Sequence, residues 1–528
     1  MRIRPLLALL ASALLSSFQT VQTELVRLSA SPPQGSDFGN SLALAGDTLF
    51  VGAQTTPGLT GRPEMGAVHV FRRGPMGWQE VQVLASTGTQ DYERMGVTVR
   101  VSGDRLAAGT LGHGVRLFRF DGTQWVTEQA IAPPAGASSQ LFGVFVALDG
   151  DTLAVSDQFE HGAGNRSGAA YVYVRGSAGW VLQQRIALLD AVAEDYAGYP
   201  ALQGNTLLIG APGKYSRQGI VDVYQRSGST WHRSQRLATP RAQPDDWFGA
   251  RIALDGDTVL VAAPQEDDVL LAGAFPPARP ARSQAGAVHV YARPAGAWIH
   301  QAELVDDGRD PSAAFGLACA LRGDLAAIGS WALGGGSGNA KALLFQRTGT
   351  RWRQVTELDS SDGTPSDAFG FSCVLGAGTV HVGAPNQEAG ARDSGAVYEF
   401  RLLGEGVTLV PGQGLNPDAL RADAAVLGQN WVAEVGVRAA HGPGAAVLVV
   451  STATGPGQPA LGGRGEWLLG SRMLLVLGPV FHDGTGTSAP FSFRVPNDLA
   501  LLGRPWAAQA LVGGPRLALT NALTGSVR

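Results

Sequence analysis

A motif that opens with Phe-Gly recurs seven times in this chain, at intervals of 47 to 67 residues. Each copy continues with an alternating apolar segment, a Gly-Asp or Gly-Asn pair and a second apolar run. Periods of this length are typical of repeat architectures, in which one unit buries its apolar faces only against its neighbours. Met and Tyr replace Phe at two of the openings, which are Phe38, Met95, Phe142, Tyr196, Phe248, Phe315 and Phe369.

The pattern within one repeat predicts four antiparallel strands. In the fifth repeat, residues 252–254 alternate, Gly256-Asp257 follows, and the next segment, Thr258–Ala263, is almost continuously apolar. Glycine at the first position of such a pair predicts a two-residue type II′ hairpin turn. A variable loop leads to a third strand rich in aromatic and β-branched residues, such as residues 170–174. The fourth strand begins at a tryptophan, which is Trp78, Trp125, Trp180, Trp231, Trp298 or Trp352.

Four-stranded units that cannot cover both of their faces alone are stable when they pack face to face around an axis. We therefore predict an all-β chain whose main domain is a seven-bladed β-propeller. The seventh repeat ends at residues 395–402 without a Trp-led strand, whereas residues 23–30 resemble the fourth strands of other repeats. The N-terminal strand is thus expected to complete the last blade, which would leave no open sheet edge at the seam.

Two short motifs carry a family resemblance. Phe-Gly opens most repeats, and Gly-Ala-Pro follows the second strand at residues 210–212 and 383–385. These motifs resemble the FG-GAP repeat of integrin-α propellers and of many secreted bacterial proteins. The resemblance covers residues 23–403, and it implies an extracellular propeller that binds a ligand.

The remaining segments are assigned by composition. Residues 1–22 combine Arg2 and Arg4 with a short apolar stretch, which predicts a bacterial signal peptide and a secreted or cell-surface protein. No other run has the length of a membrane span. Residues 404–414 are interpreted as a linker, and residues 415–528, with short apolar runs between Gly, Pro and Asn, as a small β-sandwich-like domain.

The charge balance restricts the class of partner. The formal net charge is −4, so neither nucleic acid nor an anionic membrane is expected as the main partner. Only 16% of the residues are charged, against roughly 25% in typical globular proteins, which indicates a lightly charged surface.

Two acidic motifs do not predict a metal or integrin-binding site. The Asp-x-Asp-x-Asp-Gly run that holds calcium in integrin-type propellers is absent from all seven loops. The nearest cluster, residues 266–268, is contiguous and is interpreted as a solvated acidic loop tip, with calcium as the alternative. Arg322-Gly323-Asp324 aligns with the hairpin turns of the other repeats, so it is interpreted as a turn.

No catalytic arrangement of residues emerges, so we expect a protein that is not an enzyme and has no cofactor. Cys319 and Cys373 occupy the same position in adjacent repeats, where other repeats carry Leu42 or Ile252. They are interpreted as buried small side chains, with a disulfide between the blades as the alternative.

The loops between second and third strands share one face of a propeller with the connections between blades; we call it the loop face. These loops vary most in length, and the longest covers residues 264–284. We predict a binding or adhesion module that recognises an extracellular protein or carbohydrate there. A secreted hydrolase or lyase and a structural envelope protein are the alternatives. The candidate ligand-binding residues are Lys214, Tyr215, Glu266, Asp267, Asp268, Phe275, Arg279 and Trp331.

Overall fold

The computed structural model divides the chain into two compact units, Glu24–Phe400 and the rest of the chain, and each is described by itself. The predicted signal peptide, residues 1–22, lies outside the described residues. Beyond residue 402 only the backbone of strands is described. Within residues 24–402 the description omits residues 31–35, 59–61, 76, 87–90, 135–140, 267–284, 307–313, 331–339 and 389–393.

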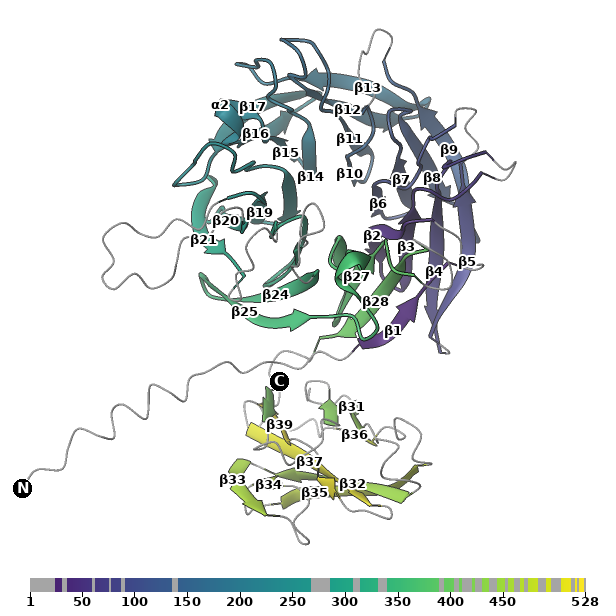
Figure 1. Ribbon diagram of the computed structural model, residues 1–528, viewed down its shortest axis with the longest axis vertical. Helices are drawn as coiled ribbons and strands as arrows, with labels where there is room; N and C mark the ends of the chain where they lie inside the picture. Colours follow the sequence, from purple (N-terminus) through teal and green to yellow (C-terminus); the bar gives the residue numbers. More distant parts are fainter. Residues whose placement is uncertain are drawn as a thin grey trace, which may run out of the picture. The chain divides into compact units, whose positions relative to one another are not determined.

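Seven four-stranded antiparallel sheets form the unit Glu24–Phe400. They stand around a ring as the blades of a propeller (Figure 1). In blades 1 to 6 the strands pair in sequence order, so that every strand neighbours the next one along the chain, and the seventh sheet has the order β26-β27-β28-β1. The prediction of a seven-bladed β-propeller is therefore confirmed.

The strands of the blades have the following bounds. Blades 1 to 3 consist of β2 (Phe38–Ala45), β3 (Thr48–Ala53), β4 (Ala67–Gly74) and β5 (Gly77–Ala85); β6 (Val99–Ser102), β7 (Arg105–Gly109), β8 (Val115–Phe120) and β9 (Trp125–Ile131); and β10 (Val146–Asp149), β11 (Thr152–Asp157), β12 (Ala169–Gly176) and β13 (Gly179–Ile186). Blades 4 and 5 consist of β14 (Tyr199–Gln203), β15 (Thr206–Ala211), β16 (Ile220–Ser227) and β17 (Thr230–Leu237); and β18 (Arg251–Asp255), β19 (Thr258–Ala263), β20 (Ala287–Ala292) and β21 (Ile299–Leu304). Blades 6 and 7 consist of β22 (Ala318–Arg322), β23 (Leu325–Ser330), β24 (Lys341–Thr348) and β25 (Arg351–Leu358); and β26 (Ser372–Leu375), β27 (Thr379–Ala384), β28 (Ala396–Arg401) and β1 (Glu24–Leu28).

The outer strand of blade 7 is β1, which comes from the N-terminal end of the propeller. It pairs antiparallel with β28, with Arg27 opposite Tyr398 and Leu28 opposite Val397. In Figure 1 the purple β1 lies beside the green β28. Backbone hydrogen bonds between the first and last strands of the unit thus close the ring.

The hairpin turns between first and second strands have the predicted geometry in blades 1 to 6, whereas in blade 7 Leu375 pairs with Val380 and the turn is four residues long. Ala45 pairs with Thr48, which leaves Gly46 and Asp47 as a two-residue turn. The φ angle of Gly46 is +56°, whereas Asp47 does not have a positive φ. A positive φ at the first central residue alone is what a type II′ turn requires, and glycine adopts it without a steric cost.

The opening of blade 4 corrects the sequence prediction by one residue. Isolated bridges link Gly66 to Met95 and Gly219 to Phe248 at the openings of blades 2 and 5, and the equivalent bridge at blade 4 joins Gly168 to Ala197. Ala197 therefore occupies the position of Phe, not Tyr196. The sequence prediction assigned the opening to Tyr196 because an aromatic residue stands at most other openings. In the fold Tyr196 lies one residue before the opening.

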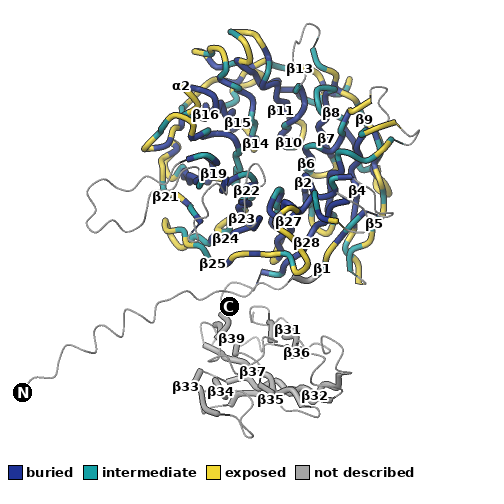
Figure 2. The backbone as a smooth tube through the Cα atoms, in the orientation of Figure 1, coloured by how far each residue is buried: buried dark blue, intermediate teal, exposed yellow. Residues whose placement is uncertain are grey.

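Apolar side chains from neighbouring blades form shared cores. One cluster combines Ala154 and Val172 of blade 3 with Leu207, Ile209 and Trp231 of blade 4. Similar clusters join blades 1 and 2, 2 and 3, 4 and 5, 5 and 6, and 7 and 1. The middle strands are buried while the outer strands alternate with exposed residues (Figure 2). Burial between blades removes the apolar surface that one sheet alone would leave in water.

A glutamine on the outer strand of one blade also bonds to the backbone of the next blade. The side chain of Gln184 donates to the Trp231 carbonyl oxygen at 3.1 Å and accepts from the Trp231 N–H at 2.8 Å. We call this two-bond contact the glutamine clamp. The same clamp joins Gln82 to Trp125, Gln129 to Trp180 and Gln235 to Trp298.

The junction between blades 7 and 1 contains a buried polar group. Glu399 of β28 accepts hydrogen bonds from Arg73 and from the Trp78 indole N–H, at 3.2 and 3.1 Å. His381 of β27 is fully buried and packs edge-on against the Trp78 ring. Burial, together with the charge of Arg73, lowers the pKa of His381 to about 3. His381 is therefore neutral at pH 7 in the folded protein.

The two cysteines are free thiols on the first strands of blades 6 and 7, so the disulfide alternative is not formed. Burial raises the pKa of Cys319 to about 12, and it also raises the pKa of Cys373. Both thiols are consequently protonated at neutral pH, which makes them poor nucleophiles.

The C-terminal unit is described as strands only. One sheet has the order β29-β39-β37-β32-β35 with β38 beside β37, a second has the order β30-β31-β36, and β33 pairs with β34. The predicted sandwich-like packing stays a prediction, because the side chains of this unit lie outside the described residues. The strands are β29 (Thr408–Val410), β30 (Leu420–Ala422), β31 (Asn430–Val435), β32 (Gly444–Ser451), β33 (Thr454–Pro459), β34 (Glu466–Leu469), β35 (Met473–His482), β36 (Phe491–Arg494), β37 (Pro505–Gly513), β38 (Ala518–Leu519) and β39 (Ala522–Ser526).

Replacing Gln184 with alanine tests the glutamine clamp. The change removes both bonds and leaves the Trp231 N–H and carbonyl group without their partners, so it should lower the free energy of unfolding by about 1–3 kcal/mol. Urea unfolding followed by tryptophan fluorescence measures the effect. Val181→Ala, at an exposed position of the same strand, should cost less than about 0.5 kcal/mol. Equal effects of the two substitutions would contradict the role of the clamp.

His381→Leu tests the buried histidine, since Leu208 and Leu260 stand at the equivalent positions of blades 4 and 5. The unfolded chain binds a proton at His381 near pH 6.5, whereas the folded protein does so only near pH 3. Stability is therefore lost as the pH falls through this window. Between pH 7 and pH 4 the parent protein should lose about 3 kcal/mol more than H381L in urea unfolding. An identical pH dependence of both proteins would refute this assignment.

Candidate functional site

Antiparallel order places the β11–β12, β15–β16 and β19–β20 loops on the same face of the ring as the connections between blades. This is the loop face, where the sequence predicts the ligand. Of the eight predicted residues, Lys214, Tyr215 and Glu266 are described. The other five, Asp267, Asp268, Phe275, Arg279 and Trp331, lie outside the described residues.

The β15–β16 loop contains an unusual left-handed turn. Its short helix α2 (Lys214–Arg217) has φ angles of +54°, +59° and +65° at Tyr215, Ser216 and Arg217. Non-glycine residues rarely adopt this conformation, because the side chain crowds the backbone at a cost of roughly 1–2 kcal/mol per residue. Three such residues in succession persist only where surrounding contacts determine the backbone.

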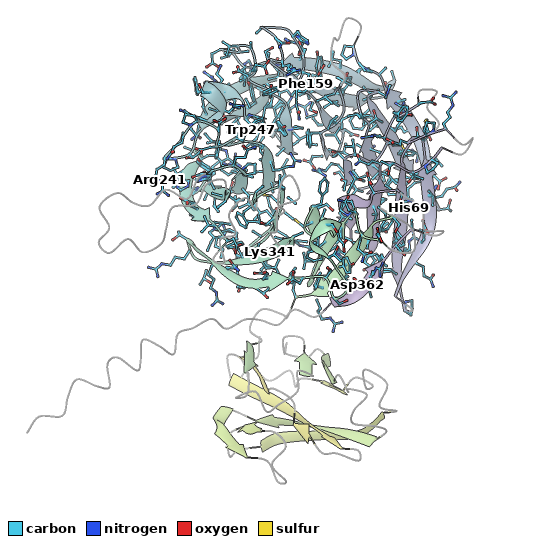
Figure 3. All side chains as sticks on the ribbon, in the orientation of Figure 1. His69, Phe159, Arg241, Trp247, Lys341 and Asp362 are labelled. Carbon is cyan, nitrogen blue, oxygen red and sulfur yellow. The ribbon has the colours of Figure 1, made fainter. Side chains whose placement is uncertain are left out.

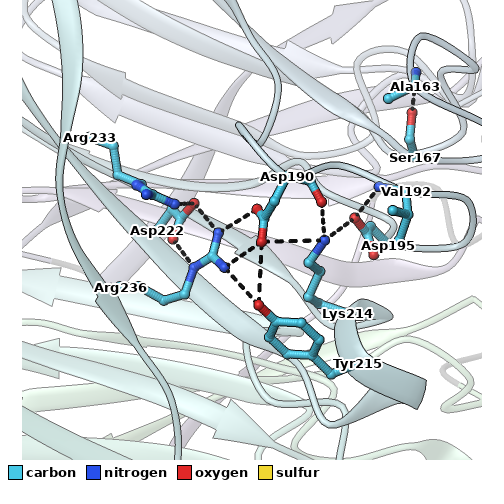
Figure 4. A network of polar contacts seen from close by, with 10 residues as sticks. All are labelled: Ala163, Ser167, Asp190, Val192, Asp195, Lys214, Tyr215, Asp222, Arg233 and Arg236. Carbon is cyan, nitrogen blue, oxygen red and sulfur yellow. Dashed lines mark hydrogen bonds and ion pairs between the residues drawn. The ribbon is translucent and has the colours of Figure 1, made fainter.

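Lys214 supplies part of that restraint. Its side chain is buried, and its ammonium group donates to the Asp190 carbonyl oxygen and, at 3.0 Å, to the carboxylate of Asp195. Asp195 is also buried, and it accepts the backbone N–H of Val192 at 2.8 Å. The ion pair thus ties the β15–β16 loop to the connection between blades 3 and 4 (Figure 4).

Arg236 extends this network toward the sheet. Its guanidinium group donates to both oxygens of Asp190 at 2.8 Å and to both oxygens of Asp222 at 2.7 and 2.9 Å. Hydrogen bonds from Arg236 hold the pKa of Asp190 well below its usual range. The same bonds raise the pKa of Arg236. Both groups are therefore charged at neutral pH.

Tyr215 lies at the outer edge of the network. Its hydroxyl group lies 3.3 Å from the Asp190 carboxylate and 3.1 Å from Arg236, while 53% of the residue is exposed. Leu189 and Val192, which flank Asp190 in the chain, are 78% and 54% exposed. We call Leu189, Val192 and Tyr215 the Tyr215 patch. All three side chains are exposed to water, and Tyr215 lies beside the Asp190–Arg236 ion pair.

The sequence prediction named Tyr215 as a candidate residue but did not name Leu189 or Val192. A signal was present, because residues 186–192 form an apolar run broken only by Asp190, in a connection between blades. Lys214 was also predicted as a ligand contact, whereas the structure uses its charge to hold the loop. The polar residues of a loop do not reveal by themselves which of them are buried.

Glu266 is a structural residue of blade 5, which corrects its interpretation as part of a solvated loop tip. It is buried, and its carboxylate lies 2.7 Å from Nε2 of His289. Nδ1 of His289 lies 3.1 Å from Nε2 of His300, whose pKa is lowered by burial and by His289. The contact with His289 of β20 accounts for the burial of Glu266. Glu266 therefore links the start of the 264–284 loop to the sheet.

A polar pocket of about 600 Å³ lies at the seam of the ring, between the connection from blade 6 to blade 7 and the β27–β28 loop. The connection includes the 3₁₀ turn η1 (Pro365–Asp367). Asp362 at the pocket is held by Arg27 at 2.5 Å and by the Tyr398 hydroxyl at 2.7 Å. The lining residues are Asp362, Thr364, Ser366, Asp367, Asn386, Gln387 and Glu388.

Comparison with known families decides the type of propeller. Three segments of the chain, residues 125–173, 231–291 and 352–400, match the family model described as FG-GAP repeat. Residues 24–400 form an FG-GAP β-propeller. The resemblance on which the sequence analysis relied is thereby confirmed.

The match also shows how the FG-GAP unit relates to the blades. The first matched segment begins at Trp125, in the fourth strand of blade 2, and ends at Tyr173, in the third strand of blade 3. The other two segments have the same offset. The family unit is thus shifted by one strand from the blade, and the same shift brings β1 into blade 7.

Two solved structures are among those similar to this chain. Sqt1 of Saccharomyces cerevisiae is 10% identical, with a TM-score of 0.41, and the match covers 76% of this chain and 95% of that one. The Cps50 (Swd1) β-propeller domain of Myceliophteria thermophila is 12% identical, with a TM-score of 0.42, and the match covers 72% of this chain and 100% of that one. No curated protein matches the sequence.

Within the described part of the chain, no group of three or more His, Cys, Asp or Glu side chains is placed to hold a metal ion. Across the same residues, no helix has the length and apolarity to cross a membrane.

Lys214→Met tests whether the buried ion pair holds the β15–β16 loop. The substitution leaves the Asp195 charge buried without its cation, so it should lower the free energy of unfolding by about 3–5 kcal/mol in urea unfolding. The double variant Lys214→Met/Asp195→Asn, which removes both charges, should recover part of that loss. A loss below about 1 kcal/mol for K214M would show that the pair is not a structural restraint.

Proposed function

We propose that this FG-GAP propeller is a secreted or cell-surface binding module without catalytic activity. It recognises an extracellular protein or carbohydrate through its loop face. FG-GAP repeats are typical of extracellular proteins, and the apolar N-terminal segment with Arg2 and Arg4 supports export. The observation that carries the proposal is the Tyr215 patch.

The patch has the composition of a recognition surface. Exposed Leu189 and Val192 lie close to Asp190 in the chain, and exposed Tyr215 contacts its carboxylate. The charge of Asp190 is balanced by Arg236. Aromatic side chains and arginine dominate the energetic centres of binding surfaces, because they bury large areas and still form hydrogen bonds. A partner that covers the patch would remove apolar surface from water without burying an unpaired charge.

The backbone beneath the patch supports the same reading. The left-handed turn at 215–217 and the buried Lys214 pair fix the loop before any ligand arrives. A rigid site loses little conformational entropy on binding, which increases affinity. Strained backbone that is held in place by buried contacts is characteristic of functional sites.

The placement of the described histidines favours binding over hydrolysis. A catalytic centre in a propeller would draw on the first strands of the blades, which line the central axis. The described histidine–carboxylate contacts instead use second, third and fourth strands or loops: His69 with Glu80, His289 with Glu266, and His381 with Glu399. These contacts lie within or between sheets, where they support the fold.

Binding to immobilised panels of extracellular proteins and of glycans tests the proposal with the full mature chain. Binding should occur on at least one panel. The double variant Leu189→Ser/Tyr215→Ala should weaken it at least about tenfold, since a loss of 1.4 kcal/mol of binding energy has that effect. Both side chains are exposed, so thermal unfolding should change little.

Ile299→Ser is the matched control, because Ile299 is 54% exposed but lies on β21, an outer strand away from the loop face. It should leave binding unchanged. The proposal fails if no panel member binds, or if the control and the patch variant lose binding equally.

A further inference from the structure

We infer that the loop face carries a second site, in which Phe159, Tyr196 and Trp247 form a stacking surface for a neutral glycan. The three residues are called the aromatic row. The inference rests on the proposed function only in placing a ligand on the loop face, because it uses none of the Tyr215 patch.

Three separate loops contribute the row. Phe159 follows β11, Tyr196 precedes the opening of blade 4, and Trp247 precedes the opening of blade 5. The ring centroids of Phe159 and Tyr196 are 5.8 Å apart, and those of Tyr196 and Trp247 are 6.2 Å apart with nearly parallel planes at 16°. All three side chains are partly exposed. Figure 3 labels Phe159, which belongs to blade 3, and Trp247, which lies in the connection between blades 4 and 5.

The fold does not require aromatic residues at these positions. The residue before the opening has a left-handed φ in several blades, with values of +51° at Tyr196 and +60° at Trp247. At the same place other blades carry a small or a charged residue with a similar φ: Asp37, Arg94, Ala314 and Ala368. A bulky side chain is the least favourable choice for this backbone. The backbone at this position therefore does not itself require an aromatic residue.

Backbone hydrogen bonds hold the row rigidly. The N–H of Tyr196 donates to the Arg166 carbonyl oxygen at 3.1 Å, and the N–H of Trp247 donates to the Arg217 carbonyl oxygen at 2.8 Å. Buried Asp195 and Asp246 precede the two aromatic residues and bond to backbone N–H groups within their own loops. The backbone that carries Tyr196 and Trp247 is thus fixed before a ligand binds.

The charged groups around the row are paired with one another. Arg166 lies 3.8 Å from Glu194, and Arg217 lies 2.6 Å from Asp245. Asn165 donates to Glu194 at 2.8 Å. The border therefore offers hydrogen-bond donors and acceptors without a net charge.

This combination fits a neutral glycan. Sugar rings present an apolar C–H face that packs on aromatic rings, and their hydroxyl groups both donate and accept hydrogen bonds, as the paired border groups do. A nucleic acid would also stack on the rings, but its phosphates require unpaired cations nearby. Arg166 and Arg217 already have carboxylate partners.

The test measures binding of the full mature chain to cellulose, chitin and β-1,3-glucan particles and to an array of neutral oligosaccharides. At least one neutral glycan should be retained, and Trp247→Ala and Tyr196→Ala should each lower the affinity at least about tenfold. Alanine occupies the same backbone position in blades 6 and 7, as Ala314 and Ala368, so both variants should fold. Unchanged thermal unfolding verifies this.

Tyr92→Ala is the matched control, because Tyr92 is an exposed aromatic residue in the connection between blades 1 and 2. It should leave glycan binding unchanged, and so should Leu189→Ser/Tyr215→Ala. The inference is overturned if no neutral glycan is retained, if only acidic polymers are retained, or if W247A and Y196A bind as the parent does. Protein binding through the Tyr215 patch would survive each of these results, so the two proposals fail separately.

Discussion

Mutual burial of neighbouring blades is the constraint on which the propeller depends. Each four-stranded sheet is apolar on both faces and is covered only when another sheet packs on each side, as Val172 and Trp231 show between blades 3 and 4. Apolar burial does not by itself specify how two blades are aligned. The glutamine clamps do, because Gln184 bonds to one particular backbone segment of the next blade. Apolar burial thus holds the ring together, and the polar contacts set the register between blades.

A second layer of polar contacts attaches the loops to this rigid ring. The third residue of the third strand is Asp222 in blade 4, His289 in blade 5 and Tyr398 in blade 7, and each contacts a charged residue at the loop face or on the neighbouring strand. In these three blades, the third residue of the third strand therefore forms the contact that attaches polar groups near the loop face to the sheet. Because the ring and the loops are joined in this way, residues on the loop face can vary while the sheets stay unchanged.

The sequence predicted what depends on local chemistry. The Gly46-Asp47 turn and the apolar Thr258–Ala263 strand follow from backbone preference and strand burial, and the ring closure follows from counting strands. The site was predicted less well, because burial of Lys214 and Glu266 depends on Asp195 and His289, which lie on other segments of the chain. Periodicity does not encode such pairings between loops.

The first strand of the unit is synthesised before any other but is the last to find its partner. Glu24 pairs with Phe400, so β1 has no neighbouring strand until the last strand of the ring has been synthesised. Contacts between such distant segments form slowly, because a long chain must first be confined. A translation product that stops before β28 would consequently keep an unpaired strand at one end and an unfinished blade at the other. The ring therefore closes only when the propeller has been synthesised completely.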